Sequence, residues 1–327
     1  MRKYLLLVFS FIFCFVMCGC GKNGSKDVLS EFSKKIEKLD SYYLDGDLEI
    51  INNDDSYLYN VEVAYSKDNN FRVSLKNKVN NHEQLILRNS DGVYVLTPSL
   101  NKSFKFQSEW PYNNSQSYIL QTILKDMKGE GVTFEVTSDG YKFLTGVNYS
   151  SNSDMKKQTV ILDKDLNVKE VAIYNDKDEL KMKMKINSID YKATFDSTYF
   201  SLNSNMASKL EESTSSLDSI IYPMYMPTGT TLSGQERVST ETGERVILTF
   251  SGDNPFMIVQ ETVSPSEDIL TIPMYGEPYI ITDSVGALSD SSINWVSNGV
   301  EFYVVSDILS QEELINVANS MSVASMK

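Results

Sequence analysis

The chain has 327 residues, enough for two ordinary domains, and it carries a formal net charge of −14 with a pI near 4.6. This acidity argues against nucleic acid as a partner and against adhesion of the protein body to anionic lipid. The nineteen Tyr and fifteen Phe lie mostly in alternating segments. That pattern is typical of a β-rich protein, because aromatic side chains favour half-buried pleated surfaces.

The chain begins with the pattern of a secretory signal. Arg2 and Lys3 form a short cationic start, and residues 4–17 are apolar except for Ser10. This run has the length of a secretory h-region and is shorter than the roughly 20 apolar residues that a comfortable membrane span needs. We therefore expect a signal peptide over residues 1–19 and no spanning helix.

Cys20 is the predicted site of lipid attachment. It follows Gly19 at the end of the apolar run, and a small residue directly before a cysteine is what bacterial lipoprotein processing requires. We expect mature Cys20 to carry a diacylglycerol on its thiol and an acyl chain such as palmitate on its amine, because two or more chains hold a protein firmly on a membrane. Residues 20–26 would form a short flexible tether. The alternative is an ordinary signal peptide that contains cysteines by chance.

A lipid anchor at Cys20 would hold the protein on the extracytoplasmic face of the cell or forespore membrane. All three cysteines, Cys14, Cys18 and Cys20, lie in or beside the signal. A processed chain therefore has no disulfide, no cysteine nucleophile and no thiolate metal site.

The remaining sequence offers no recognisable catalytic set. His82 is the only histidine, and its polar neighbours indicate a turn between two strands. The acidic pairs at 54–55, 163–165 and 176–178 lack the twelve-residue spacing of a calcium loop, and hairpin turns explain them better. We therefore predict a protein that is not an enzyme, with no metal and no cofactor.

Residues 27–205 predict one large curved antiparallel sheet with inserted helices. Apolar residues recur at helical spacing in 27–39 and 117–127, with Ser25 as a plausible N-cap of the first helix, and they alternate elsewhere. The predicted strands are 43–50, 57–65, 70–75, 84–89, 93–97, a segment around 104–106, 133–136, 141–145, 158–163, 168–174 and 180–191. Because an open sheet exposes one face, the helices are expected to cover the concavity.

A linker is predicted at 206–219, where a polar run has little to bury. Residues 220–327 then predict a small α+β domain with strands near 245–250, 256–261, 279–282, 293–297 and 300–305. Its final helix begins at a capping box formed by Ser310 and Glu313. The fold class expected is mainly β with α, a half-barrel followed by this smaller domain.

The segment from Gln84 to Pro111 resembles the YdcC-like sporulation lipoproteins of endospore-forming Firmicutes, and the likeness covers roughly residues 27–205. Such proteins are similar to LolA, RseB and the germination lipoprotein GerS, which implies an open half-barrel around helices and a link to sporulation or germination. The motif Tyr-Pro-x-Tyr-x-Pro at 222–227, with Trp295, resembles a domain of unknown function in Firmicute membrane proteins. The resemblance supplies a fold but no function.

Five apolar residues on the predicted sheet are candidates for a ligand or partner surface on the concave face: Tyr94, Leu96, Phe104, Phe106 and Trp110. The alternative is that they are core residues beneath the inserted helix. The polar loop 97–101 lies between two of their strands. It either gates the concavity or touches a partner, or it merely connects the two strands.

Two functions follow from these features. The first is a non-catalytic lipoprotein that positions or activates a cell-envelope or cortex-modifying protein during sporulation. The second is a carrier or sensor that holds a lipid or a lipoprotein acyl chain in an apolar pocket of several hundred Å³.

The Cys20→Ser variant should accumulate as uncleaved precursor or be released to the medium, because its hydroxyl cannot take the diacylglycerol. The Cys18→Ser variant is the matched control and should change little. Fractionation of membranes from cells expressing each variant measures this. A processed Cys20→Ser protein that stays on the membrane would refute the assignment.

Overall fold

The computed structural model describes residues 24–52, 55–149, 151–206, 217, 219–240, 243–281 and 283–321. Cys20, the predicted signal and most of the predicted linker lie outside these residues. In the part of the chain that is described, no helix is both long enough and apolar enough to cross a membrane.

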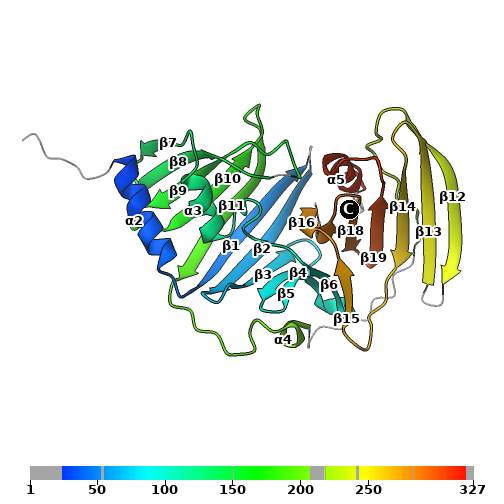
Figure 1. Ribbon diagram of the computed structural model, residues 1–327, viewed down its shortest axis with the longest axis horizontal. Helices are drawn as coiled ribbons and strands as arrows, with labels where there is room; N and C mark the ends of the chain where they lie inside the picture. Colours follow the sequence, from blue (N-terminus) through cyan, green and yellow to red (C-terminus); the bar gives the residue numbers. More distant parts are fainter. Residues whose placement is uncertain are drawn as a thin grey trace, which may run out of the picture.

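The first sheet has twelve strands in the open order β15-β6-β5-β4-β3-β2-β1-β11-β10-β9-β8-β7. It is curved and does not close into a barrel (Figure 1). Its strands are β1 (Ser41–Asn52), β2 (Asp55–Ser66), β3 (Asn70–Asn77), β4 (Glu83–Asn89), β5 (Gly92–Thr97), β6 (Lys102–Phe106), β7 (Thr133–Val136), β8 (Gly140–Gly146), β9 (Lys157–Asp163), β10 (Val168–Tyr174), β11 (Leu180–Asp190) and β15 (Leu270–Met274). The mainly β half-barrel expected from the alternation is confirmed.

Two helices pack on one face of this sheet, which we call the inner face; the opposite side is the outer face. They are α2 (Ser25–Glu37) and α3 (Leu120–Met127), and they pack against each other (Figure 1). Phe32 of α2 is 0% exposed and Ile123 of α3 is 1% exposed. Both belong to one continuous apolar core with the inward side chains of β1–β6 and β8–β11. The expected N-cap at Ser25 is wrong by one residue, since Gly24 occupies that position without a side-chain cap.

The outer face is covered over β1–β5 by the segment that follows β11. Its aromatic residues Phe195, Tyr199 and Phe200 pack on one another with ring centroids 4.7–5.2 Å apart. The short helix α4 (Leu202–Met206) ends this segment and buries Met206. Asn89 Nδ2 donates to the carbonyl oxygen of Phe200 at 2.9 Å, which fixes the segment to β4.

The second sheet has seven antiparallel strands in the order β12-β13-β14-β19-β18-β17-β16. They are β12 (Thr230–Thr240), β13 (Gly243–Gly252), β14 (Phe256–Thr262), β16 (Glu277–Ile281), β17 (Ser284–Leu288), β18 (Ser292–Ser297) and β19 (Val300–Val305). The helix α5 (Gln311–Asn319) packs on one face of it and begins at the predicted capping box of Ser310 and Glu313.

The two sheets are joined by a strand, β15, that was not predicted and whose residues lie within the expected second domain at 220–327. β15 leaves the second half of the chain and pairs in parallel with β6, from Leu270 opposite Lys102 to Met274 opposite Phe106. Val285 of β17 is buried in the core of the first sheet. The half-barrel therefore contains residues from beyond position 220.

Polar contacts fix the same junction. The buried Gln84 amide bonds both backbone groups of Val285, donating to its carbonyl oxygen at 3.0 Å and accepting from its N–H at 2.6 Å. Lys102 Nζ lies 2.5 Å from Glu301 Oε2, with the two side chains 9% and 19% exposed. Because buried polar groups are costly unless they are satisfied, these pairs favour one relative position of the sheets.

Gln84→Leu should lower the free energy of unfolding by about 2–4 kcal/mol, because it leaves both Val285 backbone groups without their partner. Urea unfolding of the purified full-length protein measures the change. Gln311→Leu is the matched control, since Gln311 makes only an exposed contact with Asp290. Equal stability of the two variants would contradict the role given to Gln84.

Candidate functional site

The five residues predicted to form one binding face lie on two faces of the sheet. Phe104 and Phe106 pair opposite Val95 and Val93 and lie on the inner face, in the same core as Trp110. Tyr94 and Leu96 alternate with those valines and point to the outer face, where they form a separate buried cluster with Met206. The expectation of a shared concave face is therefore wrong for Tyr94 and Leu96.

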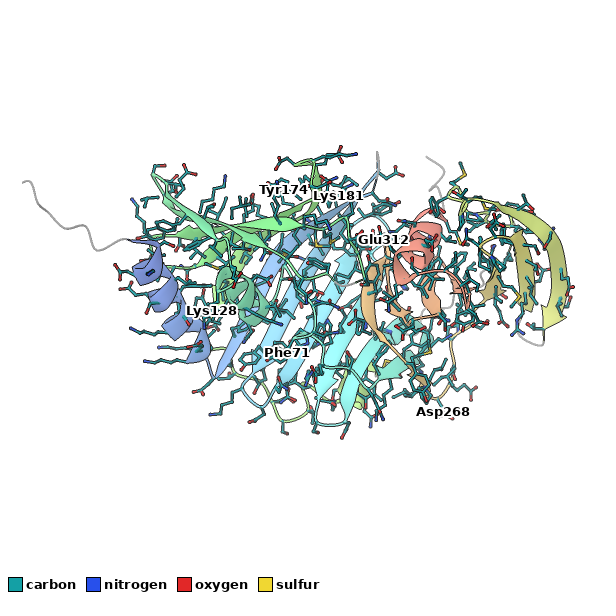
Figure 2. The ribbon with its side chains drawn as sticks, turned by 45° about the horizontal axis from the view of Figure 1, so that its top comes forward. Phe71, Lys128, Tyr174, Lys181, Asp268 and Glu312 are labelled. Atoms are coloured by element: carbon teal, nitrogen blue, oxygen red, sulfur yellow. The ribbon has the colours of Figure 1, made fainter. Side chains whose placement is uncertain are left out.

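All five side chains are buried in this structure, with exposed fractions between 0% and 3%. Trp110 packs edge-on against Phe71, with ring centroids 6.1 Å apart, and Figure 2 labels Phe71 on this part of the sheet. Their contacts are those of core residues, and their role in binding a ligand or partner stays a prediction.

A cleft lined by both polar and apolar side chains lies where the two sheets meet, and we call it the junction cleft. It consists of two adjoining cavities of about 40 Å³ and 100 Å³, which share Met155, Met182, Tyr279 and Ile280. Further lining residues come from β1, β11, β16, α5 and the loops around 114–118 and 149–155. Figure 2 shows Lys181 and Glu312, from the first sheet and from α5, on the two sides of this junction.

Glu277 is the half-buried carboxylate of the junction cleft. Asn114 Nδ2 donates to its Oε1 at 2.6 Å, and Asn113 Nδ2 donates to its Oε2. Burial raises the pKa of Glu277, and the two amide hydrogen bonds oppose this shift only in part. No lysine or arginine among the described residues forms an ion pair with this carboxylate.

Asn113 also carries an unused acceptor. Its Oδ1 atom is buried and has no hydrogen-bond partner within the described chain. It belongs to the same side chain whose amide nitrogen binds Glu277, but Asn113 itself lines neither of the two cavities. Buried acceptors of this kind are normally satisfied by a donor from protein, water or ligand.

Tyrosines and a second set of polar contacts form the rest of the wall. Asn152 Nδ2 donates to the hydroxyl of Tyr279 at 3.2 Å, and burial raises the pKa of Tyr279 to about 12. Ser153 Oγ donates to Glu312 Oε2 at 2.6 Å, and Lys181 Nζ lies 2.9 Å from Asp154 Oδ2. The arrangement suits recognition by hydrogen bonds and charge.

The described residues contain no group of three or more histidine, cysteine, aspartate or glutamate side chains that could hold a metal ion. The acidic turn at 163–165 instead satisfies its own backbone. Asp163 Oδ1 accepts from the N–H groups of Asp165 and Asn167 at 2.9 and 2.8 Å. His82 lies in the β3–β4 turn, as the sequence predicts.

Sequence reasoning missed the junction cleft. Asn113 and Glu277 are 164 positions apart, and neither stands in a recognisable motif. The one available signal was the pair of asparagines directly after an aromatic, mostly buried segment, because buried amides need partners.

Comparison with known proteins identifies the family. A family model described as "Sporulation protein YdcC-like" matches residues 1–200. The chain is also 32% identical over 333 residues to sporulation protein YdcC of Bacillus subtilis (strain 168), covering 100% of this chain and 98% of that protein. This chain belongs to the YdcC-like sporulation protein family.

Several solved structures are similar to this YdcC-like chain. A chain of the Pseudomonas aeruginosa MucA/MucB complex matches at 12% identity and TM-score 0.32, covering 90% of this chain and 97% of that one. A structure of the CwlD amidase from Clostridioides difficile in complex with the GerS lipoprotein matches at 15% identity and TM-score 0.32, covering 52% of this chain and 97% of that one. A putative outer membrane lipoprotein-sorting protein domain from Vibrio parahaemolyticus matches at 12% identity and TM-score 0.32, covering 55% of this chain and 99% of that one.

Asp126 of α3 is a second half-buried carboxylate of this YdcC-like protein. Burial raises the pKa of Asp126 to about 6, although hydrogen bonds from Ser115 and Gln158 favour its charged form. Gln158 Nε2 lies 2.9 Å from Asp126 Oδ2. Because the folded state binds this proton more tightly than the unfolded chain, ionisation of Asp126 costs stability as the pH rises through the interval between the two pKa values.

The natural protein should therefore lose up to about 3 kcal/mol of its free energy of unfolding as the pH rises from about 4 to about 7. Asp126→Asn should not show this loss, because its side chain does not ionise. Urea unfolding of both proteins across this interval measures the difference, which should grow with pH. Asp268→Asn, at an exposed carboxylate, is the control. A difference between Asp126→Asn and the natural protein that stays constant with pH would contradict the buried-carboxylate account.

Proposed function

We propose that this YdcC-like protein is a membrane-anchored, non-catalytic lipoprotein that binds and positions a protein partner of the cell envelope during sporulation. Membership of a sporulation family supports the process. The apolar run followed by Gly19 and Cys20 supports the anchor and a place on the extracytoplasmic face of the cell or forespore membrane.

The filled inner face is the observation that favours a protein partner over a carried lipid. A carrier needs an apolar cavity of several hundred Å³ between sheet and helices. In the described residues that space holds one continuous core, where Phe32, Leu44 and Ile123 are each at most 1% exposed. The two cavities of the junction cleft are about 40 and 100 Å³, too small for an acyl chain.

A larger depression of about 410 Å³ lies over β7–β10. Its lining includes Glu135, Lys142, Lys157 and Asp178, and Lys157 and Asp178 form an ion pair at 2.5 Å. A charged lining of this kind does not suit an acyl chain. The depression therefore gives the carrier hypothesis no support.

Anchoring would make a modest binding surface effective. A partner in the same membrane layer meets the tethered protein at a raised effective concentration, so a weak interface is sufficient. The junction cleft supports such a role, because residues from both halves of the chain line it and their polar groups are fixed by hydrogen bonds.

The test is recovery of the partner from sporulating cells. A deletion strain that carries the affinity-tagged full-length chain should give one specific envelope protein after cross-linking, and the deletion strain should form fewer heat-resistant spores. The Cys20→Ser chain is the matched control and should recover less of the same protein. Normal spores without the gene, together with no specific protein, would contradict the proposal.

A further inference from the structure

The acceptors of the junction cleft define what it can bind. Glu277 lines the smaller cavity and presents a carboxylate that two amides hold and that no lysine or arginine among the described residues neutralises. A half-buried carboxylate without a cation can accept further hydrogen bonds, and a donor with positive charge also balances its charge. We propose that the junction cleft receives a lysine or arginine side chain of a protein partner.

The charge of the surrounding groups favours a cation. The titratable side chains at the cleft are the carboxylates of Glu277, Asp154 and Glu312, the ammonium of Lys181 and buried tyrosine hydroxyls such as that of Tyr279. Lys181 is already bound to Asp154, and it also lies 3.8 Å from the carboxylate of Glu179. The cleft therefore keeps an excess of negative charge, which complements a basic partner.

The size of the cleft selects the source of that cation. Cavities of about 40 and 100 Å³ accommodate the end of one side chain, whereas sites for whole small molecules measure about 300 Å³ or more. Met155 and Met182 are soft apolar contacts for the methylene groups of a lysine or arginine, and Tyr279 adds an aromatic wall. A side chain presented by a protein is the occupant that these dimensions fit.

This inference rests on the proposed function, since it names the chemistry of the partner at the same cleft. The probes are the blocked tripeptides acetyl-Ala-Lys-Ala-amide and acetyl-Ala-Arg-Ala-amide, with acetyl-Ala-norleucine-Ala-amide as the neutral equivalent. Each is titrated into the full-length protein in detergent micelles, with asparagine labelled by nitrogen-15. The readout is the side-chain amide resonances of Asn113 and Asn114.

The lysine or arginine peptide should give saturable shifts of these resonances, and the norleucine peptide should give none. Glu277→Gln should weaken binding about tenfold or more, because it removes the charge that the cation meets. Glu267→Gln makes the same change at an exposed site outside the cleft and should leave binding unchanged. Thermal unfolding of each variant checks that it is folded.

The natural protein provides a test that needs no variant. Burial raises the pKa of Glu277, so lowering the pH through that raised value protonates the carboxylate and should release the basic peptides. Free n-butylammonium, which carries the charge of a lysine side chain without a peptide, is titrated as a further probe. The inference would be overturned if the norleucine peptide bound equally well, or if n-butylammonium bound while neither basic peptide did. Full affinity in Glu277→Gln would overturn it as well. Recovery of the partner from cells while no basic peptide binds would refute the inference alone. Peptide binding without any recovered partner would refute the proposed function alone.

Discussion

An open sheet of twelve strands has an apolar face that must be removed from water, and the way in which this chain covers that face determines most of its architecture. Helices α2 and α3, the segment with Trp110 and Tyr118, and Val285 of β17 from the second sheet all enter the core on the inner face. Because the described residues fill the inner face, it offers no room for a ligand. The junction cleft is instead the surface to which the first sheet and the second sheet both contribute side chains.

The pairing of β15 with β6 is what makes the junction specific. A strand from the second half of the chain supplies a hydrogen-bonded ladder to the first sheet, and Gln84 and Lys102 add buried polar contacts that are satisfied in one arrangement. Such contacts contribute little net stability, but a misplaced partner leaves them unsatisfied at a large cost. The loop that carries Asn113 is thereby held against Glu277.

Alternation predicted the strands that have one buried and one solvated face, such as β1 and β2, and it failed where that contrast disappears. β12 is exposed along most of its length, β17 is buried throughout, and the five residues of β15 include Pro273, so none of the three alternates. The same cause misplaced Tyr94 and Leu96: β5 is buried on both faces, so the pattern could not say which face each side chain joins. The capping box at Ser310 was predictable because its partners are three residues apart, whereas the contact between Asn113 and Glu277 depends on the assembled junction.

The most direct measurement is native mass spectrometry of the chain released by mild detergent from membranes of sporulating cells. We predict that the chain leaves the membrane in a complex with a second protein, and that its inner face holds no non-covalent lipid. A chain that instead carries one phospholipid or acyl chain, with no protein attached, would contradict it.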